Sequence, residues 1–355
     1  MMKILAAFDS FKESMTAYAA GEAVQRAYNN VHICPLADGG EGTMEVMNRY
    51  LHGDIHEIEV AGPLFKTVHA KLAIMDDLAI IESAQACGLD YLTEEEKNGT
   101  EATSYGVGEM MRYAYDHGVK RFLLTLGGSA CNDGGIGLLS GMGYGFFDQF
   151  DQRIPMNARG LETLDHIKKT RLDLSNIEVE GACDVINPLC GKEGATYVFG
   201  PQKKVKDLEK TDQAMKHYAK IMSELVDKDD SCVPGAGAAG GMGYAIVTGL
   251  NGKLVTGFDA VSRTVHLEEA IQKADIIFTG EGKMDHQTLY GKTPIGVLRL
   301  AQKYNKPVVA FCGKCEDKET LLEAGFEDVR CINHTDEPLS VLLEKGPQYL
   351  EEEVR

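Results

Sequence analysis

The two ends of the chain alternate short apolar runs with amphipathic stretches of helical period. Near the N-terminus, apolar runs at 3–8 and 31–37 predict strands, and periodic stretches at 17–28 and 44–51 predict helices. Thr16, a good helix-capping residue type, precedes the first helix. Strands and helices that alternate in this way are typical of a parallel sheet covered by helices.

The C-terminal third repeats this rhythm. Strands are predicted at 275–280, 307–313 and 328–333, with helices at 294–304 and 319–325 between them. In open parallel sheets, ligands bind beyond the carboxyl ends of the strands. The polar segments that follow the predicted strands are therefore expected on one rim of the sheet.

The middle of the chain follows a different pattern. Runs at 55–62, 67–75 and 78–83 alternate apolar and polar residues, as in an antiparallel meander. A predicted helix at 103–117 leads into a predicted strand at 121–126. The whole chain is thus predicted to be an α/β protein whose regular βα alternation occurs only at its two ends.

Four Gly-rich segments, three of which also contain acidic residues, stand at or near the ends of apolar runs, at 36–43, 125–135, 234–243 and 278–288. Glycine lets backbone amides approach a ligand closely, and several such amides form a concavity that holds phosphate oxygens. Acidic residues beside them suit a divalent cation that bridges those oxygens. The pattern indicates an enzyme that handles nucleotide phosphates.

Composition limits the alternatives. A chain of 355 residues with 44% hydrophobic content is long enough for about two domains. Its formal net charge of −18, without a basic tract, argues against nucleic-acid binding, and an anionic substrate would need a local basic pocket. The sequence has no signal-peptide pattern or membrane-length apolar run, and its nine Cys are scattered, so we expect a cytoplasmic protein.

Two motifs suggest other chemistry. Gly235, Gly237 and Gly240 match the GxGxxG dinucleotide fingerprint, but polar residues and Pro234 precede them where that fingerprint needs a strand. The alternatives are a loop that opens a helix and binds an anion with its amides, or close packing on small residues. Cys312-x2-Cys315 and Cys331-x2-His334 have zinc-module spacing, although Cys312 and Cys331 fall on apolar runs typical of buried thiols.

Two carboxylates are candidates for proton transfer. Asp184 follows an apolar-polar strand pattern, and Asp285 lies in the loop after the strand predicted at 275–280. Each could accept the proton of an attacking hydroxyl, and each is also explained by an Asx turn or a helix cap. Four lysines beside these motifs could neutralise a transferring phosphate: Lys12, Lys203, Lys283 and Lys292.

Taken in order, these motifs resemble those of the bacterial glycerate kinases of the type-1 group. The strings that carry the resemblance span about residues 3–313 and are DSFKES, PLADGGEGT, TLGGSACNDGG, CDVINPLCGKEGAT with FGPQK, GAGAAGGMG and TGEGKMDHQTLYGKTP. Two departures are Cys131, where the family pattern has Thr, and Lys204, where it has Gly.

The resemblance implies ATP-dependent phosphorylation of D-glycerate with Mg²⁺, with 2-phosphoglycerate as the expected product. It also implies two domains. A discontinuous flavodoxin-like α/β domain would combine 1–60 with 256–355, and an inserted mixed α/β domain would comprise 61–255. A nicotinamide-dependent oxidoreductase and a non-catalytic organic-acid-binding protein stay open as alternatives.

A phosphoryl transfer to glycerate gives the candidate residues named above their expected roles. Asp184 or Asp285 is expected to be the base, and Lys12 and Lys292 to contact phosphoryl oxygens or the glycerate carboxylate. Asp133 and Glu281 are expected to hold Mg²⁺. The expected ATP cradle consists of Gly127, Gly128, Ser129, Gly235, Gly237, Gly240 and Gly241. The expected glycerate-binding residues are Asp9, Ser10, Asp38, Gly39, Gly40 and Asn187.

Overall fold

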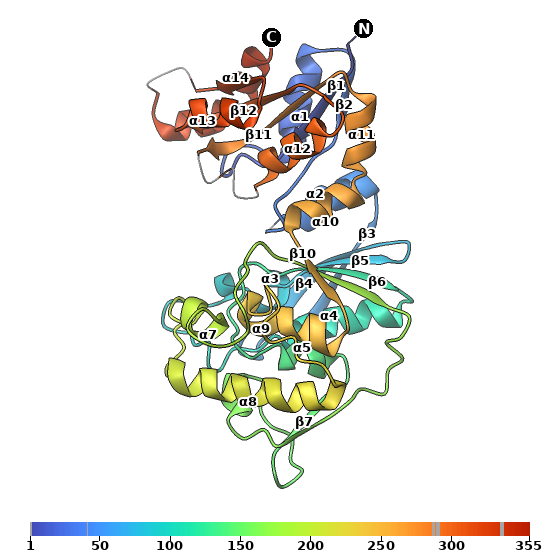
Figure 1. Ribbon diagram of the computed structural model, residues 1–355, viewed down its shortest axis with the longest axis vertical. Helices are drawn as coiled ribbons and strands as arrows, with labels where there is room; N and C mark the ends of the chain where they lie inside the picture. Colours follow the sequence, from blue (N-terminus) through green and yellow to red (C-terminus); the bar gives the residue numbers. More distant parts are fainter. Residues whose placement is uncertain (1, 41, 286–287, 289–291, 334–336) are drawn as a thin grey trace. The chain divides into compact units, whose positions relative to one another are not determined.

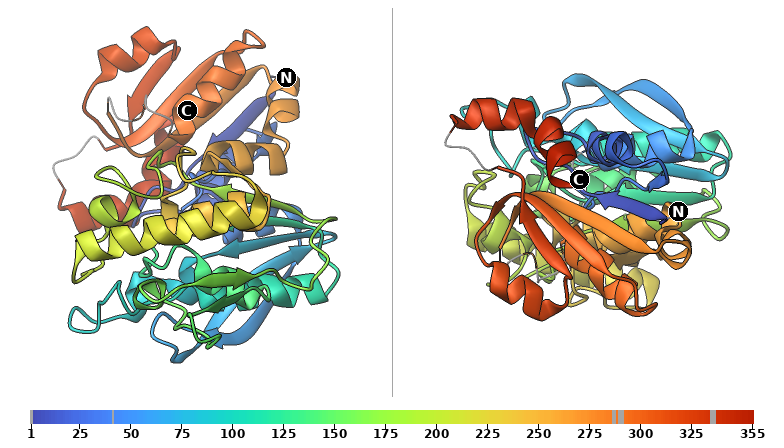
Figure 2. Two further views of the ribbon diagram at one scale, coloured as in Figure 1. Left: turned by 60° about the horizontal axis from the view of Figure 1, so that its bottom comes forward. Right: turned by 90° about the horizontal axis from the view of Figure 1, so that it is seen from above.

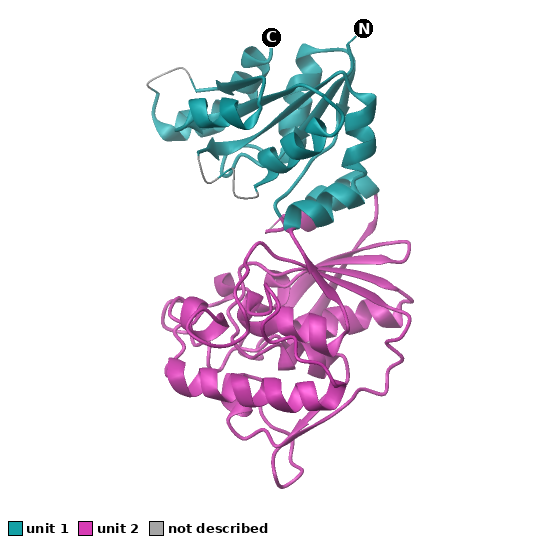
Figure 3. Cartoon of the chain, viewed as in Figure 1, with its two compact units in different colours: residues 1–38, 45–51, 257–355 teal, residues 39–44, 52–256 magenta. Residues whose placement is uncertain are grey.

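The protein is described by a computed structural model that covers residues 2–40, 42–285, 288, 292–333 and 337–355. The chain forms two compact units, coloured teal and magenta in Figure 3. The first unit combines residues 1–38, 45–51 and 257–355, and the second combines residues 39–44 and 52–256. Each unit has its own sheet and its own hydrophobic core.

The first unit is built on a five-stranded parallel sheet. Its strands are β1 (Ile4–Phe8), β2 (Val31–Ile33), β11 (Ile276–Met284), β12 (Val308–Cys315) and β13 (Asp328–Cys331). They lie in the order β13-β12-β11-β1-β2. Numbered within the unit, this is the 2-1-3-4-5 order of flavodoxin-like folds, whose topological switch point falls between β1 and β11. The parallel α/β sheet predicted for the chain ends is confirmed.

Helices cover both faces of this sheet (Figures 1 and 2). Alternate residues of β1, Ile4, Ala6 and Phe8, share a core with α1 and with Leu350 of α14. The helix α12 lies on the opposite face. The helices of this unit are α1 (Ala17–Ala27), the end of α2 (Thr43–Leu51), α10 (Gly257–Thr264), α11 (Leu267–Lys273), α12 (Thr293–Gln302), α13 (Lys318–Ala324) and α14 (Leu339–Glu353).

The second unit contains a six-stranded mixed sheet in the order β10-β9-β6-β5-β4-β3. The first three pairs are parallel and the last two antiparallel, so the predicted meander is confirmed. The strands of this sheet are β3 (Asp54–Ala61), β4 (Thr67–Met75), β5 (Leu78–Glu82), β6 (Arg121–Thr125), β9 (Glu178–Ala182) and β10 (Lys253–Val255). A separate antiparallel pair consists of β7 (Gly145–Phe147) and β8 (His166–Lys168).

The helices of the second unit are mostly short. They are α3 (Ala84–Cys87), the 3-10 turn η1 (Leu89–Tyr91), α4 (Tyr105–Asp116), α5 (Ile136–Gly141), α6 (Ala158–Leu161), α7 (Ala195–Phe199), α8 (Leu208–Val226), α9 (Ala238–Tyr244) and the π-helical turn η2 (Ala245–Gly249). Within the described residues of either unit, none of the helices has the length and apolar character that a membrane crossing requires.

Two strands, β2 and β11, differ most in extent from the sequence prediction. The regular part of β2 ends at Ile33, although the amides of Cys34 and Leu36 still donate to the carbonyls of Ala6 at 2.9 Å and Phe8 at 2.8 Å. β11 runs on to Met284, since Glu281 and Lys283 pair with β12 although their side chains are polar. The polar loop predicted after this strand therefore begins as part of the sheet.

Candidate active site

Asp9 stands directly after β1, at the switch point of the first sheet. Its carboxylate accepts hydrogen bonds from the Ser10 amide and from the Thr293 hydroxyl, both at 2.6 Å. The side chain is buried, and this burial raises the pKa of Asp9 to about 7. The charges of Asp38 and Glu281 raise it further, whereas the two hydrogen bonds lower it. Asp9 is therefore a carboxyl group that titrates near neutral pH.

Glu281 occupies the neighbouring position on β11. Its carboxylate accepts a hydrogen bond from the buried Thr288 hydroxyl at 2.9 Å and forms an ion pair with Lys292 at 3.2 Å. Burial raises the pKa of Glu281, and the Lys292 charge opposes that shift. The predicted residues Glu281 and Lys292 thus contact each other directly.

Asp285 follows the end of β11 and is also buried. Its carboxylate lies 3.1 Å from the Lys283 amino group, and its amide donates to the Thr288 hydroxyl at 3.2 Å. The charge of Asp285 raises the pKa of Glu281, which places the two carboxylates within electrostatic reach. Three predicted residues, Asp9, Glu281 and Asp285, therefore form one acidic cluster.

The loop after β1 packs closely against β11. The Asp9 amide donates to the Gly280 carbonyl at 3.0 Å, and a Cβ added to Gly282 would lie 3.4 Å from the Lys12 amide nitrogen. Ser10 and the Lys12 side chain are exposed. The polar segments after β1 and on β11 thus share one rim of the sheet, as expected, whereas Gly39 and Gly40 of the segment after β2 belong to the second unit.

This cluster suits magnesium that arrives with phosphate. Glu281 and Asp285 offer hard carboxylate oxygens, and Mg²⁺ usually takes one or two such ligands together with substrate phosphates and water. Across the described ranges, no group of three or more His, Cys, Asp or Glu side chains is arranged to hold a metal ion. His334 of the predicted zinc pattern lies outside the described residues.

In the second unit, the loop after β6 is held by a buried lysine. The Lys203 amino group donates to the Ser129 hydroxyl at 3.0 Å and to the Cys131 carbonyl at 2.7 Å. Burial lowers the pKa of Lys203. A Cβ added to Gly127 would meet Gly40 at 3.9 Å, so two of the predicted glycine loops lie side by side here. Lys203 therefore fixes the loop that contains Gly127, Gly128 and Ser129.

Asp133, expected to be a metal ligand, is completely buried in the same loop. Its carboxylate accepts hydrogen bonds from the amide and the hydroxyl of Ser104 at 2.8 Å, and from the amides of Gly135 at 3.0 Å and Gly137 at 3.4 Å. Burial raises its pKa and these donors lower it. The contacts favour a role in shaping the loop over a role in binding metal.

The segment Gly235–Gly243 is also buried. A Cβ at Gly237 would lie 2.3 Å from the Pro188 carbonyl oxygen, and one at Gly240 would lie 2.2 Å from that of Cys131. A turn rather than a strand precedes Gly235. These close approaches explain why Gly237 and Gly240 are glycines, since a side chain at either position would collide with another loop. Because no strand directly precedes Gly235, the segment lacks the strand that the nicotinamide-binding fingerprint requires.

The remaining predicted residues lie around these loops. Asp184 is exposed in the segment after β9, and Asn187 donates to the Glu193 carbonyl at 2.7 Å. The Asn187 carbonyl accepts from the Gly237 amide at 2.9 Å. Asn187 therefore ties two loops of the second unit together. Gly39 belongs to the second unit and has a φ of 86°, whereas Asp38 belongs to the first unit.

Sequence reasoning missed the hydroxyls that orient the acids and the unusual pKa of Asp9. Thr293 begins α12, where Pro294 marks the first turn. That signal could have placed Thr293 on the rim beside Asp9. The pKa of Asp9 had a weaker signal in the sequence, namely an acidic residue directly after the wholly apolar run Ile4–Phe8.

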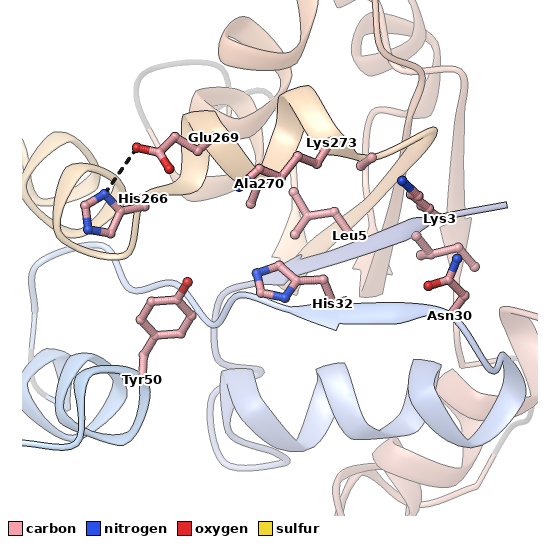
Figure 4. Close-up of a pocket in the computed structure, with 11 residues that line it drawn as sticks. Lys3, Leu5, Asn30, His32, Tyr50, His266, Glu269, Ala270 and Lys273 are labelled. Carbon is pink, nitrogen blue, oxygen red and sulfur yellow. Dashed lines mark ion pairs between the residues drawn. The ribbon is translucent and has the colours of Figure 1, made fainter.

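One cavity of the first unit lies away from this rim. It has a volume of about 390 Å³ and opens near the amino ends of β1 and β2. Figure 4 shows Lys3, Asn30 and His32 along one side and Lys273 of α11 along another, with His266 paired to Glu269. None of the predicted site residues lines it. The acidic cluster stands instead at the carboxyl edge, where ligands of this fold bind.

The first sheet is doubly wound, and buried carboxylates, ion-paired lysines and hydroxyls gather at its switch point. This arrangement is typical of α/β proteins that bind a ligand at the carboxyl edge of the sheet. Residues 4–355 match the model of the glycerate kinase family. The chain belongs to this family, and with it to the kinases.

Individual relatives agree. The chain is 39% identical to a glycerate kinase of Haemophilus influenzae, over 98% of this chain and 96% of the relative. It is 38% identical to a glycerate 2-kinase of Escherichia coli, over 89% and 86%. A crystal structure of a Salmonella typhimurium LT2 protein assigned as glycerate kinase 2 superposes with a TM-score of 0.91, at 38% identity, covering 100% of this chain and 96% of that one.

Proposed function

We propose that the protein transfers the γ-phosphoryl group of ATP in line to the 2-hydroxyl of D-glycerate, giving 2-phosphoglycerate and ADP. The observation that supports this proposal most is the cluster of Asp9, Glu281, Asp285 and Lys292 at the switch point of the first sheet. The name of the Escherichia coli relative, a glycerate 2-kinase, supports the choice of hydroxyl.

Asp9 is our proposed proton acceptor. As the glycerate oxygen forms its bond to the γ-phosphorus, the hydroxyl proton passes to the Asp9 carboxylate, and the bond from phosphorus to the bridging oxygen of ADP breaks. A general base works best with a pKa close to the working pH, and the pKa of Asp9 is about 7. Ser10 and Thr293 orient its two oxygens.

The neighbouring groups bind and neutralise charge. Glu281 and Asp285 would hold Mg²⁺, which would stabilise negative charge on the phosphate oxygens. Lys292 and the exposed Lys12 would contact phosphoryl oxygens or the glycerate carboxylate. In the second unit, the amides of Gly127–Ser129 are our candidates for the nucleotide cradle, because Lys203 holds that loop in place. Catalysis would then consist mainly of positioning and charge neutralisation.

Phosphorus NMR of the product formed from ATP, Mg²⁺ and D-glycerate tests the reaction. A doublet from a phosphate on the secondary carbon is expected, because one proton couples to the phosphorus there. A triplet would identify the 3-phosphate and overturn the choice of hydroxyl. ATP hydrolysis that does not depend on D-glycerate would overturn the substrate as well.

The base is tested by three separate substitutions. Asp9→Asn should lower kcat by about 10²–10⁴, the usual range for a general base. Asp285→Ala should lower the apparent affinity for Mg²⁺, while Asp184→Ala should have the smallest effect, since its side chain is exposed. If Asp184→Ala, or Asp285→Ala at saturating Mg²⁺, lowers kcat more than Asp9→Asn in folded protein, that residue is the base instead.

A further inference from the structure

The second unit carries a basic hollow that contains none of the residues proposed for catalysis. It has a volume of about 360 Å³ and lies beside the β7–β8 pair. Arg112 reaches it from α4, and the other lining residues come from 143–172. The lining residues are Arg112, Gly143, Gly145, Phe147, Arg153, Lys168, Lys169, Thr170, Arg171 and Leu172.

Positive charge distinguishes this hollow from the rest of the chain. Five of its ten lining residues are Arg or Lys and none is acidic, although the chain has a net charge of −18. Arg112 is neutralised by Asp116 at 2.9 Å and Lys168 by Asp151 at 2.7 Å. Arg153, Lys169 and Arg171 have no ion-pair partner among the residues that the structure describes. Three cations therefore remain available to an anion.

The floor of the hollow is backbone and a hydroxyl group. A Cβ added to Gly143 would lie 2.7 Å from Thr170 Oγ1, and one added to Gly145 would lie 2.5 Å from the Phe147 ring. Glycine at both positions lets the Thr170 hydroxyl and the Phe147 ring approach the backbone closely. The Thr170 hydroxyl accepts a hydrogen bond from the Leu172 amide at 3.1 Å, which leaves its proton free to be donated. Small residues, a hydroxyl donor and cations together suit phosphoryl oxygens.

The aromatic group of the hollow does not offer a stacking surface. His166 stacks on Phe147 with ring centres 5.3 Å apart, and the Lys168 amino group lies 4.2 Å from the centre of the Phe147 ring. These contacts cover the ring that a nucleobase would need. The hollow therefore suits a compact anion better than a nucleotide.

We propose that this basic hollow binds a small phosphorylated anion, of the class of phosphate monoesters and pyrophosphate. Arg153, Lys169 and Arg171 would supply the charge and Thr170 a hydrogen bond. The proposal does not depend on the kinase reaction, because the lining residues and the reacting groups are different.

The sequence offers a clean way to test it, because the chain has no Trp. A single Leu172→Trp substitution would place one fluorophore in the hollow, and Phe147→Trp would serve as a second reporter if the first changes the fold. Titration with pyrophosphate and with glycerol 3-phosphate at low ionic strength should give a saturable fluorescence change. No saturable change in either folded reporter would overturn the proposal.

A matched pair of charge variants tests the named residues. In the reporter background, Lys169→Gln with Arg171→Gln should weaken binding by at least about tenfold. Lys206→Gln with Lys220→Gln removes the same charge from exposed lysines outside the hollow and should change affinity by less than about twofold. If both double variants weaken binding equally, net charge alone explains the effect, and the named residues do not form a specific site. Binding of heparin alone, without either small probe, would contradict a small ligand.

Discussion

The acidic rim of the first unit and the glycine loops of the second unit have similar sequences but different structures. In the first unit, Asp9, Glu281 and Asp285 face lysines and hydroxyls, and burial raises the pKa of the first two. In the second unit, Gly237 and Gly240 lie against backbone carbonyls of other loops. Gly-rich segments therefore accompany buried carboxylates in one region and close packing in the other.

The difference comes from what surrounds each loop. The acidic residues after β1 and on β11 lie at the carboxyl edge of these strands, at the switch point of the sheet. Loops of the second unit are covered by one another: Gly134 donates to the Gly240 carbonyl at 2.9 Å, and Gly237 donates to Asn187 at 2.9 Å. Glycine permits both arrangements, so glycine content alone does not separate them.

The largest expected effect is on catalysis by the acidic rim. Asp9→Asn keeps an acceptor for the Thr293 hydroxyl but removes the ionisable group, so kcat should fall by about 10²–10⁴. In the unaltered protein, kcat should rise as pH increases through about 7, because only the ionised carboxylate accepts a proton. Steady-state rates with saturating substrates across pH measure both. If kcat shows no transition near neutral pH, Asp9 is not the base.

The same group should make stability depend on pH. The pKa of Asp9 is about 7 in the folded protein and about 4 in an unfolded chain, so the folded state binds the extra proton between these values. The free energy of unfolding should therefore fall as pH rises from about 4 to about 7, by as much as about 4 kcal/mol from this group.

Asp9→Asn should remove this contribution and stabilise the protein above pH 7, whatever its effect on rate. Urea unfolding of both proteins at pH 5 and pH 8 provides the measurement. If the free energy of unfolding changes between pH 5 and pH 8 by the same amount in both proteins, groups other than Asp9 cause the change.

The third prediction concerns the glycine loops. Gly240 has a φ of 70°, and its added Cβ would lie 2.2 Å from the Cys131 carbonyl oxygen, so Gly240→Ala should destabilise the protein by about 2–4 kcal/mol. Gly282→Ala is the matched control in the first unit, because its Cβ would meet the Lys12 amide at 3.4 Å.

Thermal unfolding of the two alanine variants compares the two regions directly. We expect a large loss for Gly240→Ala and less than about 1 kcal/mol for Gly282→Ala. A Gly240→Ala protein that keeps its melting temperature but loses affinity for ATP would favour the cradle interpretation instead.

The smallest expected effect is at Lys204, which stands where the glycerate kinase pattern has Gly. Lys204 has a φ of 54°, a conformation that favours glycine, and its ion pair with Glu94 is exposed. Lys204→Gly should therefore stabilise the protein by about 0.5–1 kcal/mol, as measured by urea unfolding. Lys206→Gly, at a neighbouring residue without positive φ, should be destabilising.

The sequence by itself determined the elements of both chain ends, the antiparallel meander and the family. Their signals are local, since apolar period and turn residues decide whether a segment becomes a helix or a strand. Thr16 illustrates this: the predicted cap accepts the Ala19 amide at 3.2 Å. The motif strings also identify the family, because the glycerate kinases have the same strings in the same order along the chain.

Only the tertiary structure decided what each polar residue does. Asp133 and Asp9 are both buried acids that follow strands. Asp133 accepts four hydrogen bonds within its own unit, and these shape a loop. Asp9 accepts two, lies at the switch point of the first sheet, and has a pKa of about 7. The unpaired cations of the basic hollow are dispersed over residues 153–171 and have no motif. Burial and proximity depend on contacts between distant segments, and these arise only when the chain has folded.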